Sequence, residues 1–286
     1  MEKLFLVFTL VFAFSFTQAN DRIIAGKAID GSQAPWQLSL KSRMGTHFCG
    51  AVLIREDVVL TAAHCVWTDG PSDIRLFGNS RSGQLGSLGR LPGAKRLIIH
   101  PKFERKNFTA HDIAIIVLKS KIKVSDTLRP VPIFNSEIGI KVDEEFHKLS
   151  DMEFMASGWG VTTPPNILEN PSEQLMAINQ IPVASSNISI LYPEIKDYLK
   201  MHYEIGDKTV SRINSLDSRT IVAEGPENYG GTCSGDSGGP LVVKDATDFY
   251  LIGVSSYTAG GDKRCKGVSV YTNVQAYADW IISEIK

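Results

Sequence analysis

The chain has 286 residues, of which 43% are hydrophobic and 21% are charged. This composition is that of a folded globular protein, and the length is sufficient for two lobes. Its 30 basic and 31 acidic side chains give a formal net charge of −1, and neither a basic stripe nor an acidic tail is present, so we expect no nucleic-acid partner.

The N-terminal residues predict a targeting segment. Lys3 gives a positive start, Leu4–Phe16 is apolar, and Thr17–Ala19 ends the run with small residues. Because the apolar run is too short for a comfortable membrane span, we interpret residues 1–19 as a cleaved secretory signal and not as an anchor. No other stretch is apolar for long enough to cross a bilayer. We therefore expect a secreted, extracellular protein with no membrane partner.

The first half of the chain predicts short strands. Residues Pro35–Leu40 alternate apolar and polar side chains, as in a half-buried strand, and Phe48–Ile54 provides a partner. Val58–Leu60 is a third apolar run. Short strands separated by glycine and proline turns continue to about Leu118, which favours a sandwich or barrel over an α/β fold. Residues Thr127–Asp143 are interpreted as the crossing between two lobes.

The second half continues the pattern of strands and ends in a helix. Strands are predicted at Phe154–Gly160, Leu241–Val243 and Phe249–Val254. Apolar residues at helical spacing predict a helix over Val274–Ile285, with Asn273 as its N-terminal cap.

The segment Gly230–Pro240 is the strongest candidate for a catalytic loop. Ser237 lies among glycines, which allow a sharp turn and a close approach to a ligand, and Asp236 precedes it directly. A serine nucleophile needs this setting: an exposed hydroxyl on a rigid loop, with backbone N–H groups directed at the developing oxyanion. Taken alone, the segment is equally compatible with a glycine-rich surface turn.

Two further motifs decide between these interpretations. His64 follows the apolar run Val58–Leu60, and Asp112 begins another apolar strand. The chain order His, Asp, Ser is that of a known serine-protease triad. From Ile23 to the C-terminus the chain resembles the trypsin/chymotrypsin family of serine proteases in five separated motifs, a specific match.

The resemblance implies an all-β fold. Two antiparallel six-stranded β-barrels would occupy about residues 23–130 and 131–272, and a C-terminal helix about residues 274–285. It implies a monomer without metal or other cofactor, with protein or peptide substrates and protein inhibitors as partners. The six histidines show no metal-ligand spacing, which agrees with this expectation.

The resemblance also implies the roles of the site residues. Ser237 would attack the scissile carbonyl, His64 would take and return the proton, and Asp112 would orient the imidazole. The N–H groups of Gly235 and Ser237 would form the oxyanion hole. Ser256 would contact the aspartate and the substrate backbone. His111 stands where the family commonly has asparagine, and we treat it as a neighbour of the site.

An activation motif follows the signal. Residues 20–22 would be a short propeptide that ends at Arg22, and a trypsin-like protease would cut there. The new amine of Ile23 would then turn inward and pair with Asp236, because a buried carboxylate without a partner is costly.

The four cysteines alone allow three disulfide connectivities. The family pattern pairs Cys49 with Cys65 and Cys233 with Cys265. No cysteine lies between Cys65 and Cys233, so a bridge common in the second lobe is missing. The segment Ser185–Glu224 is also long for the family and could contain a short helix at residues 192–203. Asn107 and Asn187 each begin a glycosylation sequon.

The primary specificity pocket is expected to carry no charge. In the family, the position of Gly231 forms the pocket base, and aspartate there selects Lys or Arg. Thr232 adds only a hydroxyl, and the walls would come from Thr258 and Ser269, which add atoms where large pockets have glycine. This resembles the elastase-like pattern and predicts cleavage after Ala, Val or Leu. A chymotrypsin-like preference for Phe, Tyr or Leu and a non-catalytic binding protein remain the alternatives.

Overall fold

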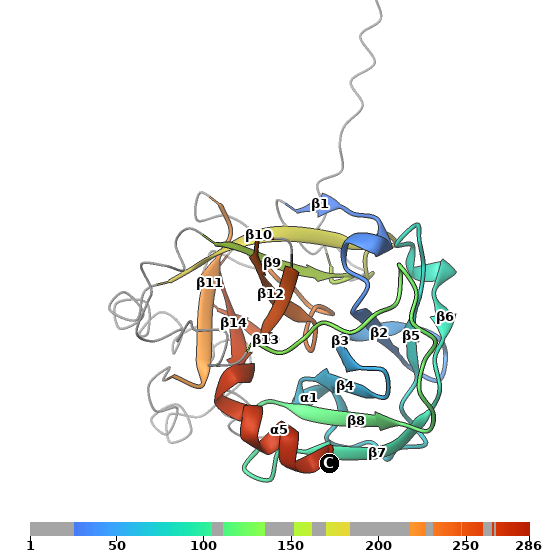
Figure 1. Ribbon diagram of the computed structural model, residues 1–286. Coiled ribbons are helices and arrows are strands. Elements are labelled where there is room, and N and C mark those ends of the chain that lie inside the picture. Colours follow the sequence, from blue (N-terminus) through green and yellow to red (C-terminus); the bar gives the residue numbers. More distant parts are fainter. Residues whose placement is uncertain are drawn as a thin grey trace, which may run out of the picture.

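The computed structural model describes residues 26–104, 111–134, 152–161, 170–183, 218–226, 231–246, 248–259, 265 and 267–286. Its strands form two barrel-like sheets that lie side by side, and a short helix ends the chain (Figure 1). Within these ranges, no helix has the length and apolar character needed to cross a membrane.

The first sheet uses the chain between residues 37 and 118 in the order β6-β5-β2-β3-β4-β8-β7, with antiparallel pairing throughout. Six strands form its body, and the two-residue β6 extends one edge. The strands are β2 (Gln37–Lys41), β3 (His47–Arg55), β4 (Val58–Thr61), β5 (Leu76–Gly78), β6 (Gly89–Arg90), β7 (Ala94–Ile99) and β8 (Ala114–Leu118). The short helices are η1 (Gly31–Gln33), α1 (Ala63–Val66) and η2 (Leu85–Ser87).

The prediction that residues 35–40 form a half-buried strand was wrong in its burial. In β2 Gln37 and Ser39, at 4% and 0% exposure, are as buried as the apolar Leu38 and Leu40, and only Lys41 at the end of the strand is partly exposed. The second barrel covers this polar face: the Gln37 side-chain oxygen accepts a hydrogen bond of 2.8 Å from the hydroxyl of Ser157 in β9 (Glu153–Gly158). Alternation in a sequence marks the two faces of a strand, but it does not show whether another lobe covers the polar one.

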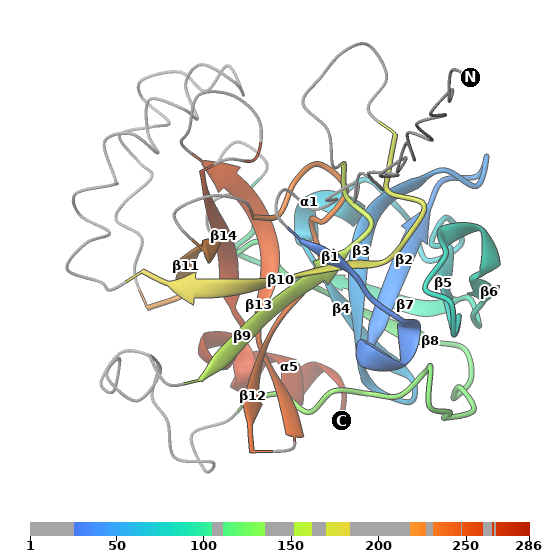
Figure 2. The same cartoon turned by 90° about the horizontal axis from the view of Figure 1, so that it is seen from above.

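The second sheet has the order β1-β10-β11-β14-β13-β12-β9. Because β9 also pairs with β10, six strands close into a barrel, and β1 adds to its outside. The remaining strands are β1 (Lys27–Ala28), β10 (Met176–Pro182), β11 (Thr220–Glu224), β12 (Pro240–Asp245), β13 (Asp248–Ala259) and β14 (Val268–Asn273). Residues 27–28 thus pair with the second barrel although they precede the strands of the first, and Figure 2 shows the two sets of strands next to each other.

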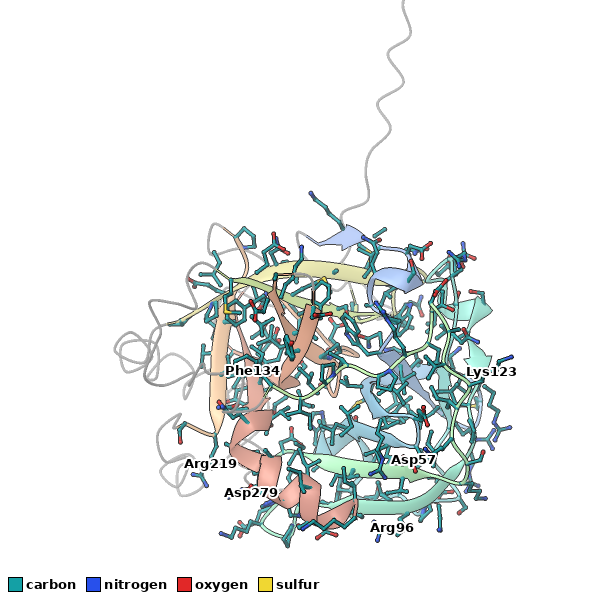
Figure 3. All side chains as sticks on the ribbon, viewed as in Figure 1. Asp57, Arg96, Lys123, Phe134, Arg219 and Asp279 are labelled. Atoms are coloured by element: carbon teal, nitrogen blue, oxygen red, sulfur yellow. A yellow bond between two sulfur atoms is a disulfide. The ribbon has the colours of Figure 1, made fainter. Side chains whose placement is uncertain are left out.

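The C-terminal segment connects the second barrel to the first. It begins as the 3-10 helix η6 (Val274–Tyr277), capped by Asn273, whose side-chain oxygen accepts from the Gln275 N–H at 3.1 Å. It continues as α5 (Ala278–Glu284). At its end, Arg55 donates to the carbonyl of Ile285 at 3.0 Å, and Arg96 donates to that of Glu284. Figure 3 labels Arg96 beside this end of the helix.

The two barrels share one hydrophobic core. A single buried cluster includes Leu60 of β4, Trp159 after β9, Val254 of β13 and Val274 of η6. A second cluster fills the first barrel and a third fills the second barrel. Because the shared cluster fixes the barrels against each other, loops from both can meet at the junction in a defined geometry.

Candidate active site

Neighbouring strands of the first barrel bring His64 and Asp112 together. The antiparallel pairing of β4 with β8 places Thr61 opposite Ala114. The residues that follow Thr61 and those that precede Ala114 therefore lie at the same end of the sheet. His64 is in the first turn of α1 there, and Asp112 lies just before β8.

Asp112 holds His64 by two hydrogen bonds. One carboxylate oxygen accepts from the backbone N–H of His64 at 2.8 Å, and the other lies 2.7 Å from its Nδ1. The hydroxyl of Ser256 donates to the second oxygen at 2.6 Å. Burial would lower the pKa of His64, but the charge and the hydrogen bond of Asp112 outweigh it and raise that pKa above its usual value. Nδ1 thus carries the hydrogen, and Nε2 is left to accept a proton.

Ser237 reaches this pair from the second barrel. Its backbone carbonyl accepts from the Gly50 N–H at 2.7 Å, which joins its loop to β3. The Cys65 sulfur lies 3.7 Å from the His64 Nε2 and 3.7 Å from the Ser237 carbonyl oxygen. His64 and Ser237 therefore both approach this sulfur atom. The Ser237 hydroxyl donates to the carbonyl of Ser256 at 3.4 Å.

Glycines are required on both sides of Ser237. Gly235 has a φ of +95° and Gly238 a φ of +81°, in the region that side chains disfavour. A Cβ at Gly238 would lie 2.2 Å from the Thr61 hydroxyl. Within the described part of the chain, the N–H groups of Gly235 and Ser237 donate to no other group, whereas that of Asp236 donates to the Cys233 carbonyl at 2.9 Å. Two N–H groups beside the hydroxyl thus remain available for a ligand oxygen.

His47 was missed by the sequence analysis. Its Nε2 lies 2.9 Å from the carbonyl oxygen of Gly235, and its Nδ1 lies 2.8 Å from the Ser39 hydroxyl. Burial lowers its pKa to about 4, so the ring is neutral near pH 7. A carbonyl can only accept, so Nε2 carries the hydrogen and fixes the peptide of Gly235. The available signal was a histidine next to a cysteine-containing strand, which is too general to assign this role.

Asp236 is a buried acid directly before Ser237. Its carboxylate accepts from the N–H of Gly160 at 2.7 Å and from that of Cys233 at 2.9 Å. Burial raises its pKa to about 6, although both hydrogen bonds act in the opposite direction. Among the described residues no cation pairs with it, and Arg22 and Ile23, the predicted cleavage site and partner, lie outside the described ranges.

The four residues expected in the specificity pocket lie together. Thr258 and Ser269 are directly opposite each other on β13 and β14. The Ser269 hydroxyl accepts from the Thr232 N–H at 2.9 Å, and the Thr258 hydroxyl donates to the Thr232 carbonyl at 2.8 Å. A Cβ at Gly231 would lie 2.6 Å from the Ser269 hydroxyl oxygen. The described part of this cluster presents hydroxyls and no carboxylate.

Two disulfides hold the loops of the site, Cys49–Cys65 and Cys233–Cys265. These are the pairs implied by the family resemblance, out of the three connectivities that counting allowed. The sequons at Asn107 and Asn187, the signal segment and the possible helix at residues 192–203 lie outside the described residues.

Comparison with known proteins identifies the family. The Trypsin family model matches residues 23–281. The chain belongs to the trypsin family. Its two barrel-like sheets and its C-terminal helix are the fold expected from the sequence.

Individual members of the trypsin family are similar along most of the chain. A vitellin-degrading protease of Bombyx mori is 31% identical over 272 residues, covering 92% of this chain and 86% of that protein. A tryptase of Mus musculus is 31% identical over 269 residues, covering 92% and 88%. A trypsin of Phaedon cochleariae is 29% identical over 275 residues, covering 94% and 90%. Together with the family match, these relatives show that the chain is a serine endopeptidase.

Proposed function

We propose that this endopeptidase is a secreted enzyme, made as a zymogen, that cleaves after small to medium uncharged residues through Ser237, His64 and Asp112. The observation that carries the proposal is a chain of hydrogen bonds from Ser256 through Asp112 to the His64 ring. The Nε2 side of this ring faces the Cys65 sulfur, which the Ser237 backbone also approaches. Because His64 Nε2 and the Ser237 carbonyl oxygen each lie 3.7 Å from the Cys65 sulfur, the geometry supports a general base near a hydroxyl that glycines expose.

The proposed chemistry follows from this chain of hydrogen bonds. As the Ser237 oxygen attacks the scissile carbonyl, its proton passes to Nε2 of His64, and Asp112 stabilises the imidazolium that forms. The imidazolium then gives the proton to the leaving amine, which departs and leaves an ester on Ser237. Water then attacks the ester while His64 takes its proton. His64 returns this proton to the Ser237 oxygen as the acid product leaves, which restores the free hydroxyl.

The oxyanion needs donors that are in place before the reaction. The unused N–H groups of Gly235 and Ser237 fit this role, and the hydrogen bond from His47 keeps the Gly235 peptide oriented. Removal of one such donor commonly costs about 100- to 1000-fold in kcat.

The pH dependence follows from His64, which must be neutral to accept a proton. Asp112 raises the pKa of His64 above the usual value of 6.5. Activity should therefore begin to fall with decreasing pH while the pH is still above 6.5. Protonation of the base is then the cause of the acid limb of the pH profile.

The specificity proposal rests on the hydroxyl cluster of the pocket. A buried Lys or Arg side chain needs a carboxylate, and Gly231, Thr232 and Ser269 supply none. Thr258 and Ser269 fill space from two adjacent strands, which favours Ala, Val or Leu. A wider pocket with a chymotrypsin-like preference for Phe, Tyr or Leu is the second candidate. One methylene in such a pocket changes selectivity by only about 10- to 200-fold.

The latency proposal rests on Asp236, whose buried carboxylate has no cationic partner among the described residues. An ammonium group supplied by cleavage after Arg22 would complete this pair and order the loop of Ser237. Secretion rests on the apolar N-terminal segment and on the two disulfides, which form in oxidising compartments.

A peptide series that differs only in the residue before the cut tests the proposal. We expect kcat/KM of the cleaved enzyme to be highest for Ala, Val or Leu and low for Lys and Arg. Ser237→Ala, as a matched control, should show no turnover with any peptide. A dominant rate for Arg or Lys would contradict the uncharged pocket, and Phe well above Ala and Val would favour the chymotrypsin-like alternative.

A further inference from the structure

The backbone of His111 sets the position of Asp112. His111 has a left-handed φ of +57°, and its carbonyl accepts a hydrogen bond of 2.8 Å from the N–H of Ile113. A bond between residues two apart closes a γ-turn, and Asp112 is its central residue. The direction of the Asp112 side chain therefore depends directly on the conformation of its neighbour.

The His111 ring connects this turn to the rest of the molecule. Its Nε2 lies 3.0 Å from an Arg219 guanidinium nitrogen, and its Nδ1 lies 3.1 Å from the Tyr277 hydroxyl oxygen. Arg219 directly precedes β11 of the second barrel, and Tyr277 ends η6. Figure 3 labels Arg219 at this end of β11, near the start of the C-terminal helix.

The partners determine the protonation state of the ring. A guanidinium group can only donate, so Nε2 must be the bare nitrogen that accepts from Arg219. Nδ1 then carries the hydrogen and donates to Tyr277. Protonation of Nε2 would remove the bond to Arg219 and place two cations in contact. The ring is therefore neutral in this arrangement and acts as a connector, not as an acid or base.

Aromatic packing fixes the plane of the ring. The His100 imidazole, which follows β7, stacks on His111 with a centroid distance of 4.8 Å and an interplanar angle of 2°. Tyr277 meets both imidazoles edge-on, at 5.8 Å from His111 and 5.1 Å from His100. Trp280 contacts the far side of the group, 4.8 Å from His100. The first barrel and the C-terminal segment thus contribute rings to one packed group next to Asp112, and the bond from Arg219 connects this group to the second barrel.

The opposite side of the turn is held as well. The Thr272 hydroxyl of β14 donates to the backbone carbonyl of Asp112 at 2.9 Å. Together with the ring contacts of His111, this bond ties the turn to the second barrel, which also carries Ser237. The first barrel supplies His64. A small movement of the turn would therefore change the geometry between groups that come from different barrels.

We propose that His111 is a positioning residue for Asp112: its left-handed backbone forms the turn that directs the carboxylate at His64, and its neutral ring locks that turn to Arg219, Tyr277 and His100. This inference rests on the proposed triad. It assigns to His111 an effect on the chemical step and none on substrate binding, because the contacts that carry it join His111 to Arg219, Tyr277 and His100 and thus act on the turn of Asp112.

The test compares His111→Ala with His111→Asn in the cleaved enzyme, with concentrations set by active-site titration. Alanine lacks the ring and disfavours a left-handed φ, whereas asparagine accepts that φ and keeps a donor and an acceptor. We expect His111→Ala to lower kcat at least about tenfold with little change in KM, since a displacement of 1 Å can cost about 100-fold. His111→Asn should stay within about threefold of wild type in kcat.

A pH profile provides a readout that a general loss of stability would not change. Because Asp112 raises the pKa of His64, a displaced carboxylate raises it less, and the acid limb of kcat/KM in His111→Ala should move to lower pH. Asn79→Ala is the matched control: Asn79 also has a left-handed φ, +61°, and its side chain accepts from Thr127 at 2.6 Å beyond β5. It should lose stability and keep the wild-type kcat and pH profile.

A wild-type kcat in His111→Ala, or a His111→Asn enzyme no faster than His111→Ala, would overturn the inference. If His111→Ala fails to fold, Tyr277→Phe removes only the hydroxyl that holds Nδ1 and must lower kcat without raising KM for the inference to stand. A wild-type enzyme that cleaves no peptide would refute the proposed function, a result distinct from an active wild type whose variants are unchanged.

Discussion

At the scale of single residues, a buried imidazole holds the backbone of Gly235, two residues before Ser237. His47 is 5% exposed and joins Ser39 of β2 to the carbonyl of Gly235. The sequence analysis could propose the triad and Gly235 because they lie in short, distinctive motifs. It could not identify His47, because its role exists only through a contact between residues 188 positions apart.

His47 should make the folded state sensitive to acid. Its pKa is near 6.5 in an unfolded chain and about 4 in the folded one, where burial disfavours the cation. Between these values the unfolded chain binds the extra proton. The stabilising contribution of the neutral ring is therefore complete above pH 6.5 and is lost as the pH falls toward 4, by up to about 3 kcal/mol.

We expect His47→Gln to remove this part of the pH dependence. The measurement is the free energy of unfolding in urea at pH 7, 5.5 and 4, in a Ser237→Ala background that prevents self-digestion. The change between pH 7 and pH 4 within each protein serves as its own control. An equally steep decrease in the glutamine variant would show that His47 is not the group that binds the proton.

At the scale of secondary-structure elements, the apolar runs predicted most of the strands. Residues 48–54 lie in β3, residues 58–60 in β4, and residues 249–254 in β13, which extends to Ala259. The predicted helix at residues 274–285 begins as a 3-10 turn and becomes α-helical only at Ala278. The pairing of β1 with β10 had no local signal, since a two-residue strand is too short to show an alternating pattern and its partner lies far along the chain.

The pairing of β13 with β14 has a consequence for the specificity pocket. Ser269 faces Thr258 across these strands, and its hydroxyl would lie 2.6 Å from a Cβ at position 231. We therefore expect Gly231→Asp alone to lose activity toward all peptides, because the new side chain displaces Ser269 from its bond with Thr232. Gly231→Asp combined with Ser269→Gly should cleave after Arg at least about tenfold faster than the single variant.

The kcat/KM values for otherwise identical Arg and Ala peptides measure this effect, and Ser269→Gly alone is the control. It should accept larger uncharged residues and still reject Arg. Equal Arg cleavage by the single and double variants would mean that Ser269 does not restrict the base of the pocket.

At the scale of the whole molecule, the two barrels were expected from the family resemblance, and the C-terminal helix from the spacing of its apolar residues. The shared core, the burial of the polar face of β2 and the ring cluster around His111 were not predictable, because each forms between segments that are far apart in the sequence. The surroundings of Asp236 support the proposed latency. Asp236 is buried with its pKa near 6 and holds only backbone donors within the described chain.

We expect the secreted precursor to be nearly inactive until it is cut after Arg22, and Arg22→Gln to stay latent after trypsin treatment. In the uncut chain the raised pKa of Asp236 destabilises the folded state as the pH rises from about 4 to about 6, since the buried carboxylate must ionise. Cleavage should therefore raise Tm more at pH 7 than at pH 4. Full peptidase activity of uncut Arg22→Gln would contradict this account.

The central claim is that Ser237 is the nucleophile and that His64 activates it. Its most direct test is labelling of the cleaved protein by a serine-reactive phosphonate, followed by peptide mapping of the modified residue. The account predicts one stoichiometric label on Ser237, no label in Ser237→Ala, and labelling slowed by several orders of magnitude in His64→Ala. A label on another serine, or undiminished labelling of Ser237→Ala, would contradict it.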